Sequence, residues 1–93
     1  MDIEFDEEKR QRTLEQRGLD FADAPLVFDK AKFTLPDDRW DYGEERFLTV
    51  GFLDDRMVIV VWTPRGEARR IISMRKCNAR EQDEFGRRLD RPG

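Results

Sequence analysis

Residues 58–76, VIVVWTPRGEARRIISMRK, constrain the fold more than any other part of the chain. The first part, residues 58–63, is almost entirely apolar, which is typical of a β-strand that is buried on both faces. A Pro-Arg-Gly turn separates it from a second predicted strand, residues 69–75, which carries arginines and a serine among only three apolar side chains. A central strand of a small protein normally supplies core residues. The pattern therefore predicts that an anionic group meets the sheet at this strand.

The composition of the 93-residue chain predicts one domain over residues 1–93, with the last few residues as a flexible tail. Because 38% of the residues are hydrophobic and 42% are charged, the core must be small and the surface densely ionic. No apolar run approaches the ~20 residues that a membrane-spanning helix needs. The acidic N-terminus also lacks the basic-then-apolar order of a signal peptide. We therefore expect a cytoplasmic protein without a membrane partner.

The cysteine and histidine counts exclude several kinds of site. A single cysteine, Cys77, cannot form an intramolecular disulfide, and the absence of histidine leaves no Cys/His cluster for zinc. The usual general base near neutral pH is missing as well. We expect no metal site and no cofactor, so any catalysis must use Arg, Lys, Glu, Asp, Tyr or Ser.

The net charge of −3 argues against indiscriminate nucleic-acid binding, but the charge is unevenly distributed. Residues 1–45 carry 14 acidic and 7 basic groups, whereas residues 46–93 carry 7 acidic and 11 basic groups. Such a chain can present a cationic surface within an acidic whole. The alternative is that the two halves neutralise each other through surface ion pairs.

Capping residues and periodicity predict the secondary structure. Asp6 is placed to cap a helix that ends at Gly18, and Asn78 with Glu81 forms a capping box for a last helix. That helix would dock through Phe85 and Leu89. The predicted elements are a strand at 3–5, a helix at 7–17, a short or bent helix at 21–28, strands at 31–35, 46–52, 58–63 and 69–75, and a helix at 79–89.

This order, (β)ααββββα, predicts an α+β fold. We expect a four-stranded antiparallel sheet with two N-terminal helices and one C-terminal helix, packed chiefly on one face of the sheet. Trp62, in the apolar strand, is assigned to the core.

Several strings of residues resemble the BrnT family, the toxins of bacterial type II toxin–antitoxin systems. They are FDEEK at 5–9, RGLDFADA at 17–24, VFD at 27–29, GEERF at 43–47, VVWTPRGEARRIISMRK at 60–76 and NARE at 78–81. Together they extend over about residues 3–81, and the RIISMRK string after its Thr-x-Arg-Gly turn is the most specific of them.

The resemblance implies a RelE-like fold and a ribonuclease activity that blocks translation. It also implies an antitoxin partner of the BrnA type, with a ribbon-helix-helix DNA-binding domain. Family toxin and antitoxin form a complex that represses its own operon, so operator DNA would be contacted only through the antitoxin complex.

The chain departs from the family pattern at the end of its first predicted helix. Family members often carry Lys-His-Gly there, with an asparagine one turn earlier. This chain has Gln16, Arg17 and Gly18, with Thr13 at the earlier position. We interpret Arg17 as a structural or phosphate-contacting residue in place of that histidine.

Metal-independent RNA cleavage proceeds through attack of a 2′-hydroxyl on the adjacent phosphorus. The protein must help to remove that proton, stabilise the negative charge of the transition state and protonate the leaving 5′-oxygen. Preorganised cations can supply much of the stabilisation, and the planar guanidinium matches two phosphate oxygens at once. A cluster of arginines with a hydroxyl is therefore a credible ribonuclease site without histidine.

Three residues are the catalytic candidates: Arg75 as the phosphate clamp, Ser73 as a group that orients the phosphate or the 2′-hydroxyl, and Arg46 at the start of its strand. Without a bulge, alternation along the strand predicts two faces. One carries Arg69, Ile71, Ser73 and Arg75, and the other carries Arg70, Ile72, Met74 and Lys76. The bland alternatives are a surface ion pair of Arg75 with Glu44 or Glu45, a structural serine, and a local ion pair of Arg46.

Five further residues are candidate RNA contacts. They are Arg65 on the turn, Arg69 and Arg70 in the strand, Lys9 in the first helix, which matches a family lysine, and Tyr42, whose ring is suited to stacking on a base. A solvated helix lysine and ordinary turn solvation are the alternative interpretations of Lys9 and Arg65.

Three functions remain open on the sequence alone. The leading hypothesis is an endoribonuclease toxin that a cognate antitoxin neutralises. The second is a catalytically inactive RelE-like module that serves as antitoxin partner and co-repressor. The third is a small regulatory protein that binds nucleic acid directly, which the acidic net charge and the lack of a recognisable binding motif disfavour.

Overall fold

The computed structural model describes the backbone of residues 1–89 and the side chains of residues 1–88. The predicted docking of Leu89 and the predicted C-terminal tail lie outside these residues. The elements are β1 (Ile3–Glu4), α1 (Glu7–Arg17), the 3₁₀-helix η1 (Phe21–Asp23), α2 (Ala24–Asp29), β2 (Phe33–Pro36), β3 (Phe47–Leu53), β4 (Arg56–Arg65), β5 (Ala68–Lys76) and α3 (Ala79–Leu89). No helix in this part of the chain is long and apolar enough to cross a membrane.

The strands form a mixed five-stranded sheet in the order β1-β5-β4-β3-β2. Strands β2 to β5 pair antiparallel, as predicted. The short β1 adds a fifth strand, because Ile3 and Glu4 pair in parallel with Arg69 and Arg70. The α+β class is therefore confirmed, whereas the prediction of a purely antiparallel four-stranded sheet is wrong.

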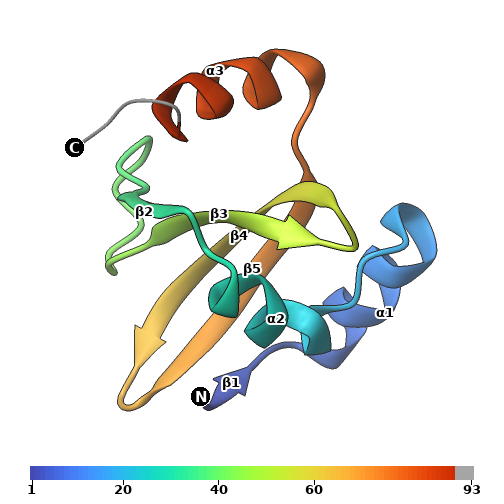
Figure 1. Cartoon of the computed structure of the whole chain (residues 1–93). Helices are drawn as coiled ribbons and strands as arrows, with labels where there is room; N and C mark the ends of the chain where they lie inside the picture. Colours follow the sequence, from blue (N-terminus) through green and yellow to red (C-terminus); the bar gives the residue numbers. More distant parts are fainter. Residues whose placement is uncertain (90–93) are drawn as a thin grey trace.

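The helices cover both faces of the sheet, which corrects the prediction that they pack chiefly on one. Figure 1 shows α2 and α3 on opposite sides of the strands. The reason lies in β4, whose buried side chains point in both directions. Val58, Val60 and Trp62 belong to the core on the side of α2, and Ile59 and Val61 to the core on the side of α3. We call these the α2 side and the α3 side.

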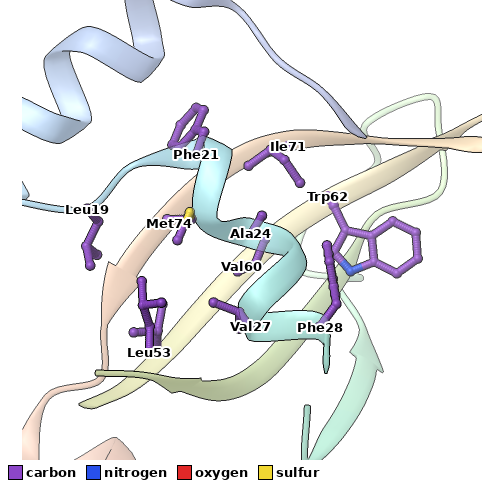
Figure 2. Packing of buried hydrophobic residues seen from close by; sticks show 11 residues of the cluster. Leu19, Phe21, Ala24, Val27, Phe28, Leu53, Val60, Trp62, Ile71 and Met74 are labelled. Carbon is purple, nitrogen blue, oxygen red and sulfur yellow. The ribbon is translucent and has the colours of Figure 1, made fainter. Parts of the chain in front are cut away.

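The larger core lies on the α2 side. Phe21, Ala24 and Val27 have no exposed surface, and their side chains point from η1 and α2 onto the strands (Figure 2). The rings of Phe28 and Trp62 meet edge to face with centroids 5.7 Å apart. Trp62 is thus confirmed as a core residue.

A glycine permits the close approach of α2 to the sheet. A Cβ atom placed on Gly51 of β3 would lie 2.6 Å from the carbonyl oxygen of Val27, closer than real Cβ contacts come. The helix can therefore rest on the backbone of β3 at this point.

The α3 side has a smaller core. Among the α3 side chains that the structure describes, only Phe85 is buried there. Its ring meets that of Phe33 with centroids 5.3 Å apart. The helix begins with the predicted capping box: Asn78 Oδ1 accepts from the Glu81 N–H, and Glu81 Oε1 accepts from the Asn78 N–H.

The predicted caps of α1 are confirmed as well. Asp6 Oδ1 accepts a hydrogen bond of 3.0 Å from the N–H of Lys9. Gly18 follows the last turn with a φ of 68°, and its N–H donates to the carbonyl of Leu14. A short or bent helix was predicted over residues 21–28. The structure has η1 followed by α2 there, with Pro25 in the first turn of α2.

Candidate functional site

A β-bulge in β5 decides which of its side chains share a face. In the ladder between β4 and β5, Val61 lies opposite Ser73 and Trp62 lies opposite Ile71, which leaves Ile72 as an extra residue. An extra residue interrupts the alternation of side chains and increases the local twist of the strand. The two halves of β5 are therefore out of step with each other.

The bulge places Arg70, Ser73 and Arg75 on the same face, the α3 side of the sheet. Their partners across the ladder are Thr63, Val61 and Ile59. Directly paired residues direct their side chains to the same face, and Ile59 and Val61 belong to the α3-side core. Strict alternation placed Arg70 on the face opposite Ser73 and Arg75, and that prediction is wrong because it assumed an unbroken strand.

Arg69 lies on the α2 side instead, away from these three residues. Its guanidinium carbon is 4.5 Å from the ring centroid of Phe28 and 4.5 Å from that of Trp62, a geometry suited to cation–π attraction. Ile72 and Met74 are also separated, since Ile72 packs on the α3-side core and Met74 is buried on the α2 side. We therefore leave Arg69 out of the site.

Arg75 forms a bidentate ion pair with the first turn of α3. Its Nη1 and Nη2 donate to the two carboxylate oxygens of Glu81 at 2.6 and 2.7 Å. Hydrogen bonding from Arg75 lowers the pKa of Glu81 to about 2, and the same bonds raise the pKa of Arg75. The alternative interpretation expected an ion pair of Arg75 with Glu44 or Glu45, but the partner is Glu81. A guanidinium carries five N–H groups, so three remain for another ligand.

Ser73 lines a hollow of about 210 Å³ between α1 and β5, which we call the α1–β5 hollow. The hollow carries three basic side chains and no acidic one. Its lining consists of Lys9, Arg12, Thr13, Gln16, Arg17, Ile72 and Ser73. Two of the predicted site residues, Lys9 and Ser73, are thus brought together here.

One face of α1 forms the wall of this hollow. The wall residues at positions 9, 12, 13, 16 and 17 follow the helical spacing that places side chains on one face. None of them is apolar, and α1 has no buried residue. The helix is held to the edge of β5 by Arg17, whose Nη1 donates to the carbonyl oxygen of Met74 at 2.9 Å.

Arg70 is not among the residues that line the α1–β5 hollow, but it shares an electrostatic neighbour with Arg12. The pKa of Asp6 is lowered, chiefly by its hydrogen bond from Lys9 and also by the charges of Arg70 and Arg12. Both guanidinium groups therefore lie within electrostatic range of the same carboxylate. Arg70 itself is 3.5 Å from the carboxylate of Glu4, measured from Nη1 to Oε1.

Arg46, Arg65 and Tyr42 gather around Glu44 at the beginning of β3 and the end of β4. Arg46 Nε is 3.3 Å and Arg65 Nη2 is 3.5 Å from a carboxylate oxygen of Glu44. The guanidinium carbon of Arg46 lies 3.9 Å from the ring centroid of Tyr42. The local ion pair weighed for Arg46 is therefore present, and a cation covers one face of the Tyr42 ring.

Sequence reasoning did not propose Arg12, Thr13 and Gln16, and it gave Arg17 a role only by comparison with the family. The signal was the run of polar residues at helical spacing along residues 9–17, which is equally typical of a solvated helix face. Only the position of α1 against the edge of β5 shows that this face borders a hollow.

Two further observations concern possible metal ligands and Cys77. Within residues 1–89, no group of three or more His, Cys, Asp or Glu side chains is placed to hold a metal ion. Cys77 is buried, and desolvation raises the pKa of its thiol to about 11.

The comparison with known families gives one match. Residues 5–81 match the family described as the ribonuclease toxin, BrnT, of type II toxin–antitoxin systems. No curated protein matches the chain significantly.

Proposed function

The chain belongs to the BrnT family of ribonuclease toxins from type II toxin–antitoxin systems, and we propose that it is an endoribonuclease that cleaves RNA without a metal ion and so inhibits translation. The observation that supports this proposal is the bulge in β5, which turns Arg70, Ser73 and Arg75 to one face of the sheet. Two guanidinium groups and a hydroxyl on one face are suited to a phosphodiester.

The reaction that we propose transfers the phosphoryl group within the RNA. The 2′-oxygen forms a bond to phosphorus, the bond from phosphorus to the 5′-oxygen breaks, and the proton of the 2′-hydroxyl is removed while the leaving oxygen gains one. The products are a 2′,3′-cyclic phosphate and a free 5′-hydroxyl. Arg75 and Arg70 would stabilise the charge on the non-bridging oxygens, and Ser73 would orient the phosphate or the 2′-hydroxyl.

Arg75 is suited to the role of phosphate clamp because Glu81 holds its guanidinium in place but accepts only two of its five N–H groups. The carboxylate takes one N–H from each terminal nitrogen, so Nε–H and one N–H on each terminal nitrogen stay available. Arg46, which directly precedes β3 and pairs with Glu44, would contribute a further cation.

A type II toxin has a protein antitoxin as its partner, and we propose that this partner is a ribbon-helix-helix protein of the BrnA type. The complex would bind operator DNA through the antitoxin alone. We also propose that the fold is RelE-like and that the protein acts in the cytoplasm, where its RNA substrate is found.

The alternative function is a catalytically inactive module that serves as antitoxin partner and co-repressor. Two observations favour it. Arg46, Arg70 and Arg75 each already have a carboxylate partner. In addition, Arg17, at a position where the family often has histidine, donates to the backbone of β5.

The test is RNA cleavage in EDTA by the wild type, by Arg75→Ala and by Arg69→Ala. Arg69 is the matched control because it is an arginine of the same strand whose side chain lies on the opposite face. Removal of one charge-stabilising group typically costs about 10²- to 10³-fold in rate, so we expect that loss for Arg75→Ala and near-normal cleavage for Arg69→Ala.

Each other result has a definite meaning, provided that circular dichroism shows all three proteins folded. Equal losses in both variants would place the site elsewhere or indicate a general effect on the strand. Equal cleavage by all three would indicate a contaminating nuclease. No cleavage by the wild type, with or without ribosomes, would favour the inactive module.

A further inference from the structure

The α1–β5 hollow differs from the other candidate phosphate contacts Arg46, Arg65, Arg70 and Arg75 in the state of its charges. Arg46, Arg65, Arg70 and Arg75 are each within 4.0 Å of a carboxylate. Among the described residues, by contrast, neither Lys9 nor Arg12 has a carboxylate within that distance of its charged group. The hollow therefore offers two cations that form no close ion pair with a described carboxylate.

The position of α1 keeps this hollow open. Arg17 ties the last turn of the helix to the Met74 carbonyl, and Arg10, on another face of the helix, ties it to Asp20 through hydrogen bonds of 2.7 and 3.1 Å. Between these polar anchors no apolar side chain of α1 fills the space against β5. A polar hollow is therefore part of how this helix is attached.

The donors in the hollow are those that recognise a phosphate. Lys9 brings an ammonium group and Arg12 a guanidinium, while Thr13 and Ser73 bring hydroxyls and Gln16 an amide. Charge-assisted hydrogen bonds from such groups to phosphate oxygens are among the strong ones. No acidic side chain belongs to the lining, so no carboxylate within the hollow itself opposes an anion.

Ser73 connects the α1–β5 hollow with the face of β5 that carries Arg70 and Arg75. It lines the hollow, and on that face it lies between the two arginines. We propose that the α1–β5 hollow is a second phosphate subsite, in which Arg12 and Lys9 hold a phosphodiester next to the one that is cleaved. This inference rests on the proposed function, and it assigns a role to Arg12, which was not among the predicted site residues.

The subsite predicts a specific electrostatic contribution to RNA binding. For single-stranded nucleic acid, each phosphate contact contributes about 0.7 to the slope of the logarithm of affinity against the logarithm of salt concentration. Loss of one contact should weaken binding uniformly across sequences and reduce that slope by about the same amount.

The experiment measures binding to a probe that cannot be cleaved, labelled 2′-O-methyl heptauridylate, by fluorescence anisotropy from 25 to 200 mM salt. The proteins are the wild type, Arg12→Gln and the matched control Arg87→Gln. Arg87 is an exposed helical arginine of α3 that pairs with Asp83. Both variants replace one arginine by glutamine, so they change the net charge equally. We expect Arg12→Gln to weaken binding about 5- to 10-fold at low salt and to lower the slope by about 0.7, with Arg87→Gln unchanged.

Two outcomes would overturn the subsite: equal effects of the two substitutions, or no measurable binding of the probe by the wild type. Competition by inorganic phosphate, with no difference between the wild type and Arg12→Gln for the heptauridylate, would also reject an RNA subsite and leave a site for a free anion.

The cleavage assay separates this inference from the proposed function. If the wild type cleaves RNA and Arg12→Gln binds the probe normally, the subsite is wrong while the ribonuclease stands. If the wild type does not cleave but Arg12→Gln loses affinity, the hollow binds RNA in a protein that is not a ribonuclease.

Discussion

Helices α1 and α2 lie against the same sheet through opposite kinds of surface. The 6-residue α2 buries Ala24, Val27 and Phe28, whereas the 11-residue α1 buries none of its side chains. Length therefore does not decide how firmly a helix is attached. The short helix stabilises the fold through apolar contact, and the long one is held by polar contacts that leave a cationic hollow beside it.

Helix α3 lies between these two cases. It docks through Phe85 and through the ion pair between Arg75 and Glu81, so part of its attachment is apolar and part is electrostatic. The three helices therefore differ in what attaches them: apolar surface for α2, apolar surface and an ion pair for α3, and polar contacts of Arg10 and Arg17 for α1.

The largest expected difference concerns apolar side chains. Phe28→Ala in α2 should lower the free energy of unfolding by about 3 to 5 kcal/mol, because it leaves a cavity against Trp62. Leu14→Ala in α1, where the side chain is exposed, should change it by less than about 0.5 kcal/mol. Urea unfolding followed by tryptophan fluorescence measures both. Similar losses in the two variants would mean that α1 is anchored by apolar contact after all.

The next difference concerns pH and the attachment of α3. Folding lowers the pKa of Glu81 from its ordinary 4.5 to about 2, through hydrogen bonds from Arg75. A carboxyl group with a lowered pKa stabilises the folded state fully above its unfolded pKa, and that contribution is lost as the pH falls through the folded pKa. The pair should thus lose about 1 to 2 kcal/mol of stabilisation between pH 4.5 and 2, discounted because both side chains are partly solvated.

Glu81→Gln is the variant that isolates this contribution. Other carboxylates with lowered pKa values, among them Asp20 and Asp37, titrate in both proteins. The difference in urea midpoint between the wild type and Glu81→Gln should therefore shrink on acidification from pH 4.5 to 2. A difference that stays constant over that interval would show that Glu81 contributes by packing or by capping rather than by charge.

Local sequence signals predicted the elements of this fold well. Asp6 and Gly18 at the ends of α1 and the Asn78–Glu81 capping box are formed as predicted, because each depends on neighbours within a few residues. The apolar run at 58–63 and the strand patterns at 31–35, 46–52 and 69–75 likewise placed strands β2 to β5. The parallel pairing of the two-residue β1 with β5 depends on residues more than sixty positions apart, and nothing local encodes it.

The site was predicted less completely, and the bulge is the reason. Ile72 is a β-branched residue that is common in regular strands, and no glycine or proline marks it as the extra residue. Its effect is nevertheless to reverse the faces assigned to Arg69 and Arg70. The role of Arg12 was missed for a different reason, since a polar helix face looks the same in sequence whether it borders solvent or a hollow.

The smallest expected differences concern two glycines, and they should have opposite signs. Gly18 ends α1 with a positive φ of 68°, whereas Gly86 lies inside α3; a Cβ on either would meet no atom within 4 Å. An added methyl group would therefore clash at neither position, and the two variants should differ only in the backbone conformation that alanine prefers. Gly18→Ala should destabilise the protein by about 1 kcal/mol, because alanine disfavours the left-handed conformation.

Gly86→Ala should stabilise it by about 0.5 to 1 kcal/mol, because alanine is the better helix former. Thermal unfolding of the two variants beside the wild type measures both signs in one experiment. If Gly18→Ala proved neutral, α1 would have to end in another conformation without cost. Since Arg17 immediately precedes this glycine and holds the helix to β5, the same variant should then also show altered binding of RNA in the α1–β5 hollow.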